Sequence, residues 1–178
     1  TKSFEQSYNC QAAVDGHGQV IVATGVSQEA NDKEQLKPMM ERLKANLEGA
    51  KPGRVTTDNG YFSEDNVTYL AQERIDGYVA TGRIKHGDKP LAVPRGRIPK
   101  EATLKERMSR KLRTLKGRSI YAKRKEISEP VFGQIKEVRG YRQFLLRGLN
   151  KVSAEWDLIC LGHNLLKLFR STLRPAIA

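Results

Sequence analysis

Apolar and polar residues alternate near the start of the chain. Two β-rich runs, "QSYNCQAAVD" and "QVIVATGVS", lie within residues 5 to 27 and are separated by "DGHG". An Asp-Gly pair between two such runs supplies the backbone freedom that a tight turn needs. This pattern predicts a β-hairpin.

Helical and strand-like patterns then alternate. Residues 32 to 47 predict a helix, with Asn31 or Asp32 as its cap, Gly49 closing it, and Pro38 either kinking the first turn or delaying the start. Its apolar stripe is Leu36, Met39 or Met40, Leu43 and Leu47. A strand at 55 to 57, a helix over 63 to 75 capped by Ser63, and a buried strand in "GYVATG" follow. The order β-β-α-β-α-β predicts an α/β fold with a mixed sheet.

Two more helices are predicted near the end of the chain, over 128 to 139 and 153 to 170. In the first, Ser128 would cap the start, and the buried face would hold Val131, Ile135 and Val138. Its opposite face would present Glu129, Gly133, Lys136 and Gly140. In the second helix the expected core stripe is Trp156, Ile159, Cys160, His163 and Leu166. On that stripe His163 is interpreted as a hydrogen-bonded core histidine and not as a metal ligand.

Positive charge is concentrated in one part of the chain. The chain carries a net charge of +12, and residues 83 to 125 alone hold 16 Lys or Arg against 3 acidic residues. Prolines 90, 94 and 99 predict an extended loop in the first half of that segment, followed by helix. A solvated basic face is the simple alternative, but confinement of the excess to one segment favours contact with nucleic acid.

Other features exclude several classes of protein. Cys10 and Cys160 are isolated, so neither a disulfide framework nor a zinc site is indicated, and a reducing cytoplasm is the expected compartment. No signal peptide or long uncharged apolar run is present. Because Thr1 is not a methionine and strand-like sequence begins almost at once, we expect the chain to be a piece of a longer one.

Two carboxylates are candidates for chemistry. Asp58 follows a predicted central strand, where α/β sheets present ligands, although an Asp before Asn-Gly is also an ordinary turn. Glu129 stands in a basic region, although a carboxylate in the first turn of a helix is also favoured by the helix dipole. Mg²⁺ binds through one or two carboxylates plus substrate phosphates, so Asp58 and Glu129 together would suit a magnesium centre, with two ions expected in the complete protein.

The chain resembles a known family in six segments that occur in the family's order. They are "YNCQAAVD", "VIVATGVSQEANDKEQL", "TTDNGYFS", "EPVFGQIK", "RGYRQFLLRGL" and "EWDLICLGHNLLKL". The family is that of the DDE insertion-sequence transposases with a Y-R-E-K signature. The resemblance covers nearly the whole chain and implies an RNase H-like mixed sheet flanked by helices, with a basic insertion and C-terminal helices.

The resemblance also implies roles for particular residues. Asp58 would be the second acidic residue of the catalytic triad and Glu129 the third, both holding metal. Tyr121, Arg124 and Lys136 would hold the transposon end, and the same basic region adds Arg139 and Arg142 as expected DNA contacts. Four residues separate Arg124 from Glu129 where the signature has three, so either Arg124 or Lys125 could fill the arginine position.

The first acidic residue of the triad has no clear counterpart. Asp15 is the only candidate near the right place, and its "DGHG" setting is better explained as a hairpin turn. We therefore expect the chain to lack the first strand of the sheet and to be a partial catalytic domain over residues 1 to 178, with 83 to 125 contacting DNA.

The expected function is DNA transposition, with Mg²⁺-dependent phosphodiester cleavage and strand transfer at transposon ends. The expected partners are transposon-end and target DNA and a second copy of the protein, with no membrane. Two alternatives stay open: a non-catalytic DNA-binding remnant, and a metal-dependent nuclease of the same fold that does not transfer strands.

Overall fold

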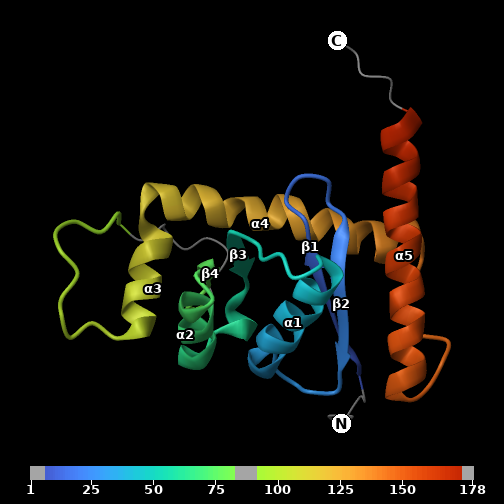
Figure 1. The fold of residues 1–178 in the computed structure, drawn as a ribbon, viewed down its shortest axis with the longest axis horizontal. Helices are drawn as coiled ribbons and strands as arrows, with labels where there is room; N and C mark the ends of the chain where they lie inside the picture. Colours follow the sequence, from blue (N-terminus) through green and yellow to red (C-terminus); the bar gives the residue numbers. More distant parts are fainter. Residues whose placement is uncertain (1–6, 83–91, 174–178) are drawn as a thin grey trace, which may run out of the picture. The chain divides into compact units, whose positions relative to one another are not determined.

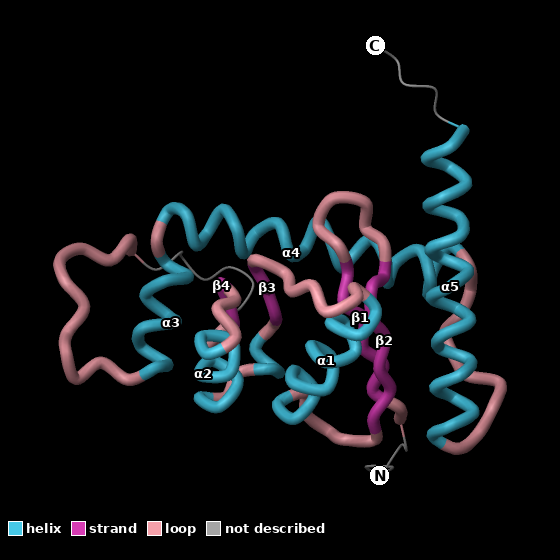
Figure 2. Tube along the Cα trace, viewed as in Figure 1, coloured by secondary structure: helices cyan, strands magenta, loops and turns pink. Residues whose placement is uncertain are grey.

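The chain folds into two compact units, which are described separately. The computed structural model describes residues 7–82 and 92–173. Unit 1 comprises residues 1–30, 41–49 and 125–178, and unit 2 comprises residues 31–40 and 50–124. The described strands form a two-stranded sheet in each unit (Figures 1 and 2). A mixed α/β fold is thereby confirmed, whereas the RNase H-like sheet and its missing first strand stay predictions.

The predicted hairpin is confirmed in unit 1. Strands β1 (Asn9–Val14) and β2 (Ile21–Ser27) pair antiparallel, from Asn9 opposite Ser27 to Val14 opposite Ile21. At the turn the Asp15 carboxylate accepts hydrogen bonds from the backbone N–H groups of His17 (3.0 Å) and Gly18 (2.7 Å). Asp15 thus has the turn role that its sequence context indicates.

Helix α5 (Leu149–Leu173) lies along β2 and closes the core of unit 1 (Figure 1). The buried side chains of this core are Ile21, Val131, Ile135, Trp156, Ile159 and Cys160. The indole N–H of Trp156 donates to the carbonyl of Gln11 over 3.0 Å. The predicted stripe is confirmed except at Leu166, which is 42% exposed. Because 3.6 residues per turn do not divide seven evenly, a stripe with heptad spacing drifts around the helix.

Helix α4 (Leu115–Gly133) corrects the prediction of a helix that begins at Ser128. Ser128 and Glu129 lie well inside this helix, so Ser128 is not a cap and Glu129 is not a first-turn carboxylate. Pro130 is compatible with a helix start near Ser128, because proline is common in the first turn of a helix. In the interior of a helix, proline removes the donor to the carbonyl four residues back. Here the side-chain amide of Gln19 donates to that carbonyl, of Glu126, over 2.8 Å.

A single π-helical turn, η3 (Gln134–Val138), follows α4 and changes the register of the chain. The N–H of Arg139 donates to the carbonyl of Gln134 five residues back, over 2.9 Å. Ile135 stays buried, but Val138 is 79% exposed, so its predicted burial is wrong. An i to i+5 turn advances the chain by less than 100° per residue, which moves Val138 off the buried face.

Unit 2 is built around a short parallel sheet of β3 (Arg54–Thr57) and β4 (Asp76–Val79). Helix α2 (Glu64–Gln72) connects these strands, and the predicted cap is confirmed because the Ser63 hydroxyl accepts from the N–H of Asn66 over 3.1 Å. The buried core consists of Leu36, Met40, Leu70, Ile75, Val79 and Met108.

Helix α1 (Leu36–Asn46) begins later than predicted, after a 3-10 turn, η1 (Lys33–Gln35). Pro38 therefore falls in its first turn, where a missing N–H costs nothing. The stripe is buried from Leu36 to Leu43, but Leu47 lies beyond the helix and is 37% exposed. Gly49 closes the helix with a positive φ of 88°.

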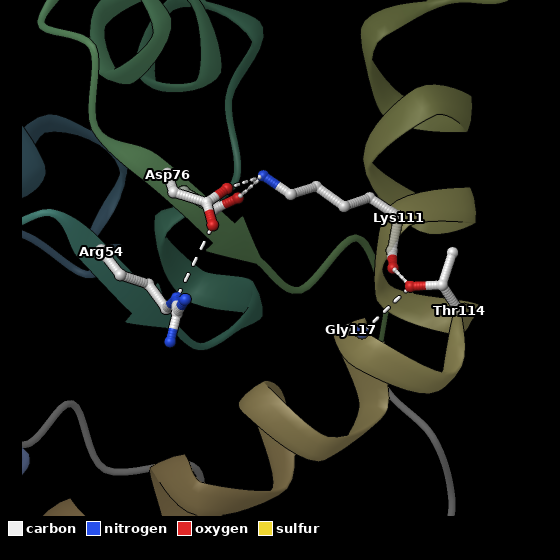
Figure 3. A network of polar contacts seen from close by, with 6 residues as sticks. Arg54, Asp76, Lys111, Thr114 and Gly117 are labelled. Carbon is white, nitrogen blue, oxygen red and sulfur yellow. Dashed lines mark hydrogen bonds and ion pairs between the residues drawn. The ribbon is translucent and has the colours of Figure 1, made fainter.

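Helix α3 (Leu104–Arg113) begins at a capping box of Thr103 and Glu106 and meets α4 at a tight corner. At the corner the Thr114 hydroxyl donates to the carbonyl of Lys111 (2.8 Å) and accepts from the N–H of Gly117 (2.9 Å). Figure 3 shows this corner beside an ion pair in which the Lys111 ammonium lies 2.6 Å from the Asp76 carboxylate. The ion pair holds α3 to the end of the parallel sheet.

None of the helices in the described part of the chain combines the length and apolar character needed to cross a bilayer.

Candidate functional site

Asp58 lies directly after β3, as predicted, and caps the 3-10 turn η2 (Asn59–Tyr61). Its Oδ1 atom accepts a hydrogen bond from the N–H of Gly60 over 2.9 Å. The side chain is half-buried. The strand end and this capping bond hold the carboxylate in one orientation, at the edge where parallel strands present their ligands.

Two of the predicted DNA contacts belong to unit 2 with Asp58: Tyr121, which is affected by the charge of Asp58, and Arg124, which lies against Tyr121. Burial raises the pKa of Tyr121 above its ordinary value. The charge of Arg124 and its hydrogen bond to Tyr121 lower this pKa, whereas the carboxylate of Asp58 raises it. The Arg124 guanidinium lies 5.5 Å from the centroid of the Tyr121 ring. The structure therefore groups a carboxylate, a phenol and a guanidinium from the predicted set.

Asp32 is a carboxylate of this region and one of the two predicted caps, Asn31 or Asp32, of the helix over 32 to 47. Its side chain makes no capping hydrogen bond, because α1 begins four residues later. A Cβ atom built on Gly60 would lie 2.6 Å from Asp32 Oδ2 and 3.2 Å from Asp58 Oδ1. Both carboxylates thus lie beside Gly60, and the absence of a side chain at that position leaves room for the carboxylate of Asp32.

The pKa of Tyr61 is affected by the same two carboxylates. Burial raises the pKa of its phenol far above the ordinary value, and the carboxylates of Asp32 and Asp58 both raise it further. The side-chain amide of Asn66, which is 2% exposed, links η1 to η2. It donates to the carbonyl of Lys33 (2.7 Å) and to that of Tyr61 (2.8 Å). The sequence alone does not indicate this link by Asn66, since an asparagine in a helix is usually exposed.

Glu129 belongs to unit 1, where its side chain is exposed on α4. The helix dipole favours carboxylates only near a helix start, so it does not explain a glutamate at this position. Asp58 belongs to unit 2. Convergence of Asp58 and Glu129 on one metal centre therefore stays a prediction.

The other three predicted DNA contacts also lie in unit 1, in different settings. Lys136 is exposed on η3, with its ammonium 5.8 Å from the centroid of the Phe132 ring. Arg139 is half-buried and donates to the carbonyl of Ile159 on α5 over 3.2 Å. Arg142 forms an exposed ion pair with Glu137. Lys136 and Arg142 are thus both exposed, whereas Arg139 contributes to the packing of α5.

Some cations of the basic segment hold the loop before α3, others are exposed, and Arg107 is both. Arginines on α3 donate to backbone carbonyls of the loop before it: Arg107 to Lys100 (2.8 Å), Arg110 to Arg95 (2.7 Å) and Arg113 to Ala92 (3.0 Å). The predicted extended loop is confirmed over the described residues 92–103, and Pro90 lies outside them. The exposed cations of the described segment are Arg95, Arg97, Lys100, Lys105, Arg107, Lys116, Lys123 and Lys125.

A divalent cation can be tested against the donors that the described residues offer. Across 7–82 and 92–173, no three or more His, Cys, Asp or Glu side chains are grouped so as to hold a metal ion. The nearest approach to such a set is the carboxylate pair Asp32 and Asp58, both of which lie beside Gly60. Two carboxylates with room for waters and phosphate oxygens are the donor set that Mg²⁺ accepts.

Comparison with known proteins places the chain in a family. The family model described as "Transposase DDE domain" matches residues 1–165. No curated protein and no solved structure matches the chain significantly. The family acts in DNA transposition, uses divalent metal ions and has DNA as its partner. Since the match spans most of the 178 residues, the chain belongs to the transposase DDE domain family.

Proposed function

We propose that the protein cleaves phosphodiester bonds at transposon ends and joins the freed 3′-hydroxyl to target DNA, with Mg²⁺ as cofactor. The observation that carries this proposal is the grouping of Asp58 with Tyr121 and Arg124 in unit 2. In this grouping an anionic metal ligand lies beside a hydrogen-bond donor and a cation suited to a phosphate.

Each side chain has a separate task in this proposal. Asp58 would bind Mg²⁺ through a carboxylate oxygen. Arg124 would pair with a phosphate of the transposon end, since a guanidinium presents two parallel donors to phosphate oxygens. Tyr121 keeps its proton at neutral pH, since the ordinary pKa of a tyrosine is about 10 and burial raises it here, so it can donate a hydrogen bond to the same phosphate. Bound Mg²⁺ would activate the attacking oxygen and stabilise the leaving one.

Unit 1 would supply the remaining parts. Glu129, as the third acidic residue of the triad, would add a second metal ligand, and Lys136 would contact the transposon end. We also propose an RNase H-like partial catalytic domain over residues 1–178 and a homodimer on DNA. The exposed position of Glu129 within α4 supports its role, because nothing in the local helix chemistry requires a carboxylate there.

The test uses the full-length protein and a plasmid that carries both ends of its element. Asp58→Asn and Glu129→Gln should abolish nicking and strand transfer with Mg²⁺ or Mn²⁺ while DNA binding stays nearly unchanged. Lys136→Ala should weaken binding to the end sequence first. Asp65→Asn and Glu126→Gln, two exposed carboxylates of α2 and α4, are the matched controls.

Three outcomes separate the alternatives. Nicking without joining would indicate a nuclease, and DNA binding without metal-dependent nicking would indicate a non-catalytic remnant. Normal cleavage by the Glu129→Gln protein would remove that residue from the metal centre. The homodimer is checked by the mass of the complex on a single DNA end, measured by light scattering.

A further inference from the structure

The loop between η3 and α5 presents two apolar side chains to solvent. It runs from Gly140 to Gly148, which have positive φ angles of 74° and 87°, and it leads into the first turn of α5 (Figure 1). Leu145 is 81% exposed and its neighbour Leu146 is 45% exposed. Apolar side chains gathered at one exposed place mark a surface that another molecule covers.

Contacts within unit 1 fix the conformation of this loop. The Glu155 carboxylate on α5 accepts hydrogen bonds from the backbone N–H groups of Leu145 and Leu146, each over 2.9 Å. Phe144 packs against the core of the unit, and its ring meets that of Tyr8 edge-on, with 6.2 Å between the centroids. The two leucines are therefore held outward on a preformed surface, which lowers the entropic cost of binding a partner.

Positive charge surrounds the two leucines. Residues 136–151 hold five Lys or Arg against one acidic residue, Glu137. Arg147 donates from Nη1 to two main-chain carbonyls of the loop, over 3.0 Å and 3.1 Å. Both acceptors are neutral, so the charge of this guanidinium stays available to a phosphate. Arg142 forms an exposed ion pair with Glu137, and a pair of this kind is weak enough to be exchanged for a phosphate.

An apolar tip inside a cationic rim matches the chemistry of DNA. Proteins that bend DNA insert leucine or a similar apolar side chain between base steps, while arginine and lysine contact the phosphates. A second copy of this chain would instead bring the same excess of positive charge to the surface, and like charges repel. Charge complementarity therefore favours a polyanion as the molecule that covers the loop.

We propose that the loop over residues 140–148 is a DNA wedge. Leu145 enters between neighbouring base pairs of the transposon end, and Arg142 and Arg147 contact the phosphates beside it. This inference rests on the proposed function, because it takes the transposon end as the DNA that is bound. It adds unstacking of bases to the tasks of metal binding and phosphate binding, which other residues perform.

The experiment measures base stacking without cleavage. 2-Aminopurine, whose fluorescence rises when the base is unstacked, replaces adenine at successive positions of a duplex that carries the element's end. The full-length protein binds this duplex in the absence of divalent metal. We expect a rise at one pair of neighbouring positions. Leu145→Ala should lose most of this rise, while the affinity falls by about tenfold or less, because regained stacking offsets the lost apolar contact.

Three further variants serve as controls. Leu145→Met retains an apolar wedge and should retain the rise. Leu158→Ala removes a leucine of α5 that is 68% exposed but lies outside the loop, and it should change neither fluorescence nor affinity. Arg142→Gln should reduce the slope of log affinity against log salt by about 0.9, the contribution of one phosphate, whereas Leu145→Ala should leave the slope unchanged. Thermal unfolding shows whether each variant is folded.

The outcomes separate the wedge from the proposed function. A rise that persists in folded Leu145→Ala, or that is absent from the wild type at every position, would overturn the wedge and leave metal-dependent cleavage untouched. A rise that depends on Leu145 in a protein that nicks with neither Mg²⁺ nor Mn²⁺ would support the wedge and overturn the proposed function. Self-association without DNA that Leu145→Ala abolishes would assign the loop to a protein interface instead.

Discussion

The side-chain amide of Gln19 donates to the main-chain carbonyl of Glu126 over 2.8 Å, the carbonyl whose helical partner Pro130 removes. The same side chain accepts from the Lys167 ammonium over 2.7 Å, and its main-chain carbonyl accepts from His163 Nε2 over 3.0 Å. One residue of the β1–β2 turn therefore satisfies polar groups of both α4 and α5. It allows a proline inside the helix that carries Glu129.

Gln19→Ala should destabilise the protein by about 2 kcal/mol, because it leaves the Glu126 carbonyl without its donor and removes the Lys167 contact. Pro130→Ala restores an N–H that can bond to that carbonyl within the helix. The double variant should therefore be more stable than the sum of the single effects indicates. Urea unfolding of the wild type, the two single variants and the double variant measures this coupling. Strictly additive effects would contradict the idea that the Gln19 amide replaces the donor that Pro130 removes.

His163 should make unit 1 sensitive to mild acid. The ring is 1% exposed, and burial lowers its pKa below the ordinary value of 6.5. The charges of Lys167 and Arg139 lower the pKa further, while the hydrogen bond to Gln19 acts in the opposite direction. The folded chain thus favours the neutral ring, and the unfolded chain binds a proton at higher pH than the folded one.

Stability from His163 is therefore complete above about pH 6.5 and is lost as the pH falls below that value toward the folded pKa. Unfolding midpoints in urea should decrease between about pH 7 and about pH 5 in the wild type. His163→Gln should be less stable at neutral pH and show a flatter dependence on pH over this range. Parallel curves for the two proteins would show that other groups cause the loss.

Gly117→Ala should destabilise unit 2 by about 2 kcal/mol or more, a cost typical of overpacking. A Cβ atom at this position would lie 2.0 Å from the carbonyl oxygen of Lys111, at the corner between α3 and α4 (Figure 3). Gly133→Ala is the matched control, since that glycine has helical angles and nothing within 4 Å of its Cβ position. The control should be neutral or stabilised by up to about 1 kcal/mol, the difference in helix propensity. Thermal unfolding compares the two.

Exposed lysines of the basic segment should carry its DNA binding. In the logarithmic plot of affinity against salt, each neutralised phosphate contributes a slope of about −0.9. Lys105→Ala with Lys116→Ala should therefore reduce the slope by about 1.8 units without a change in stability. Arg107→Ala should instead lower stability, because its guanidinium holds the loop at Lys100. Fluorescence anisotropy with duplex DNA from about 50 to about 200 mM salt gives the slopes, and an unchanged slope would exclude these lysines.

Local patterns were sufficient for several elements. The Asp-Gly turn, the β1–β2 hairpin, the Ser63 cap and the apolar stripe of α1 from Leu36 to Leu43 depend on neighbouring residues, and the structure confirms each of them. The excess of positive charge between residues 83 and 125 and the family segments likewise belong to the sequence. Together they indicate DNA as the partner and the transposase family.

Tertiary contacts decided the rest. Pro130 looks like the beginning of a helix unless a residue more than a hundred positions away supplies the donor it lacks, and only the fold brings Gln19 there. Asp32 resembles a helix cap until the approach of the η2 turn places it beside Asp58. Arg107 resembles a DNA contact until the loop before α3 folds back onto it. In each case the local sequence is compatible with two roles, and contact with a residue distant in sequence decides between them. The physical reason is that a backbone polar group needs a hydrogen-bond partner wherever the fold places it, and only the fold determines which side chain supplies it.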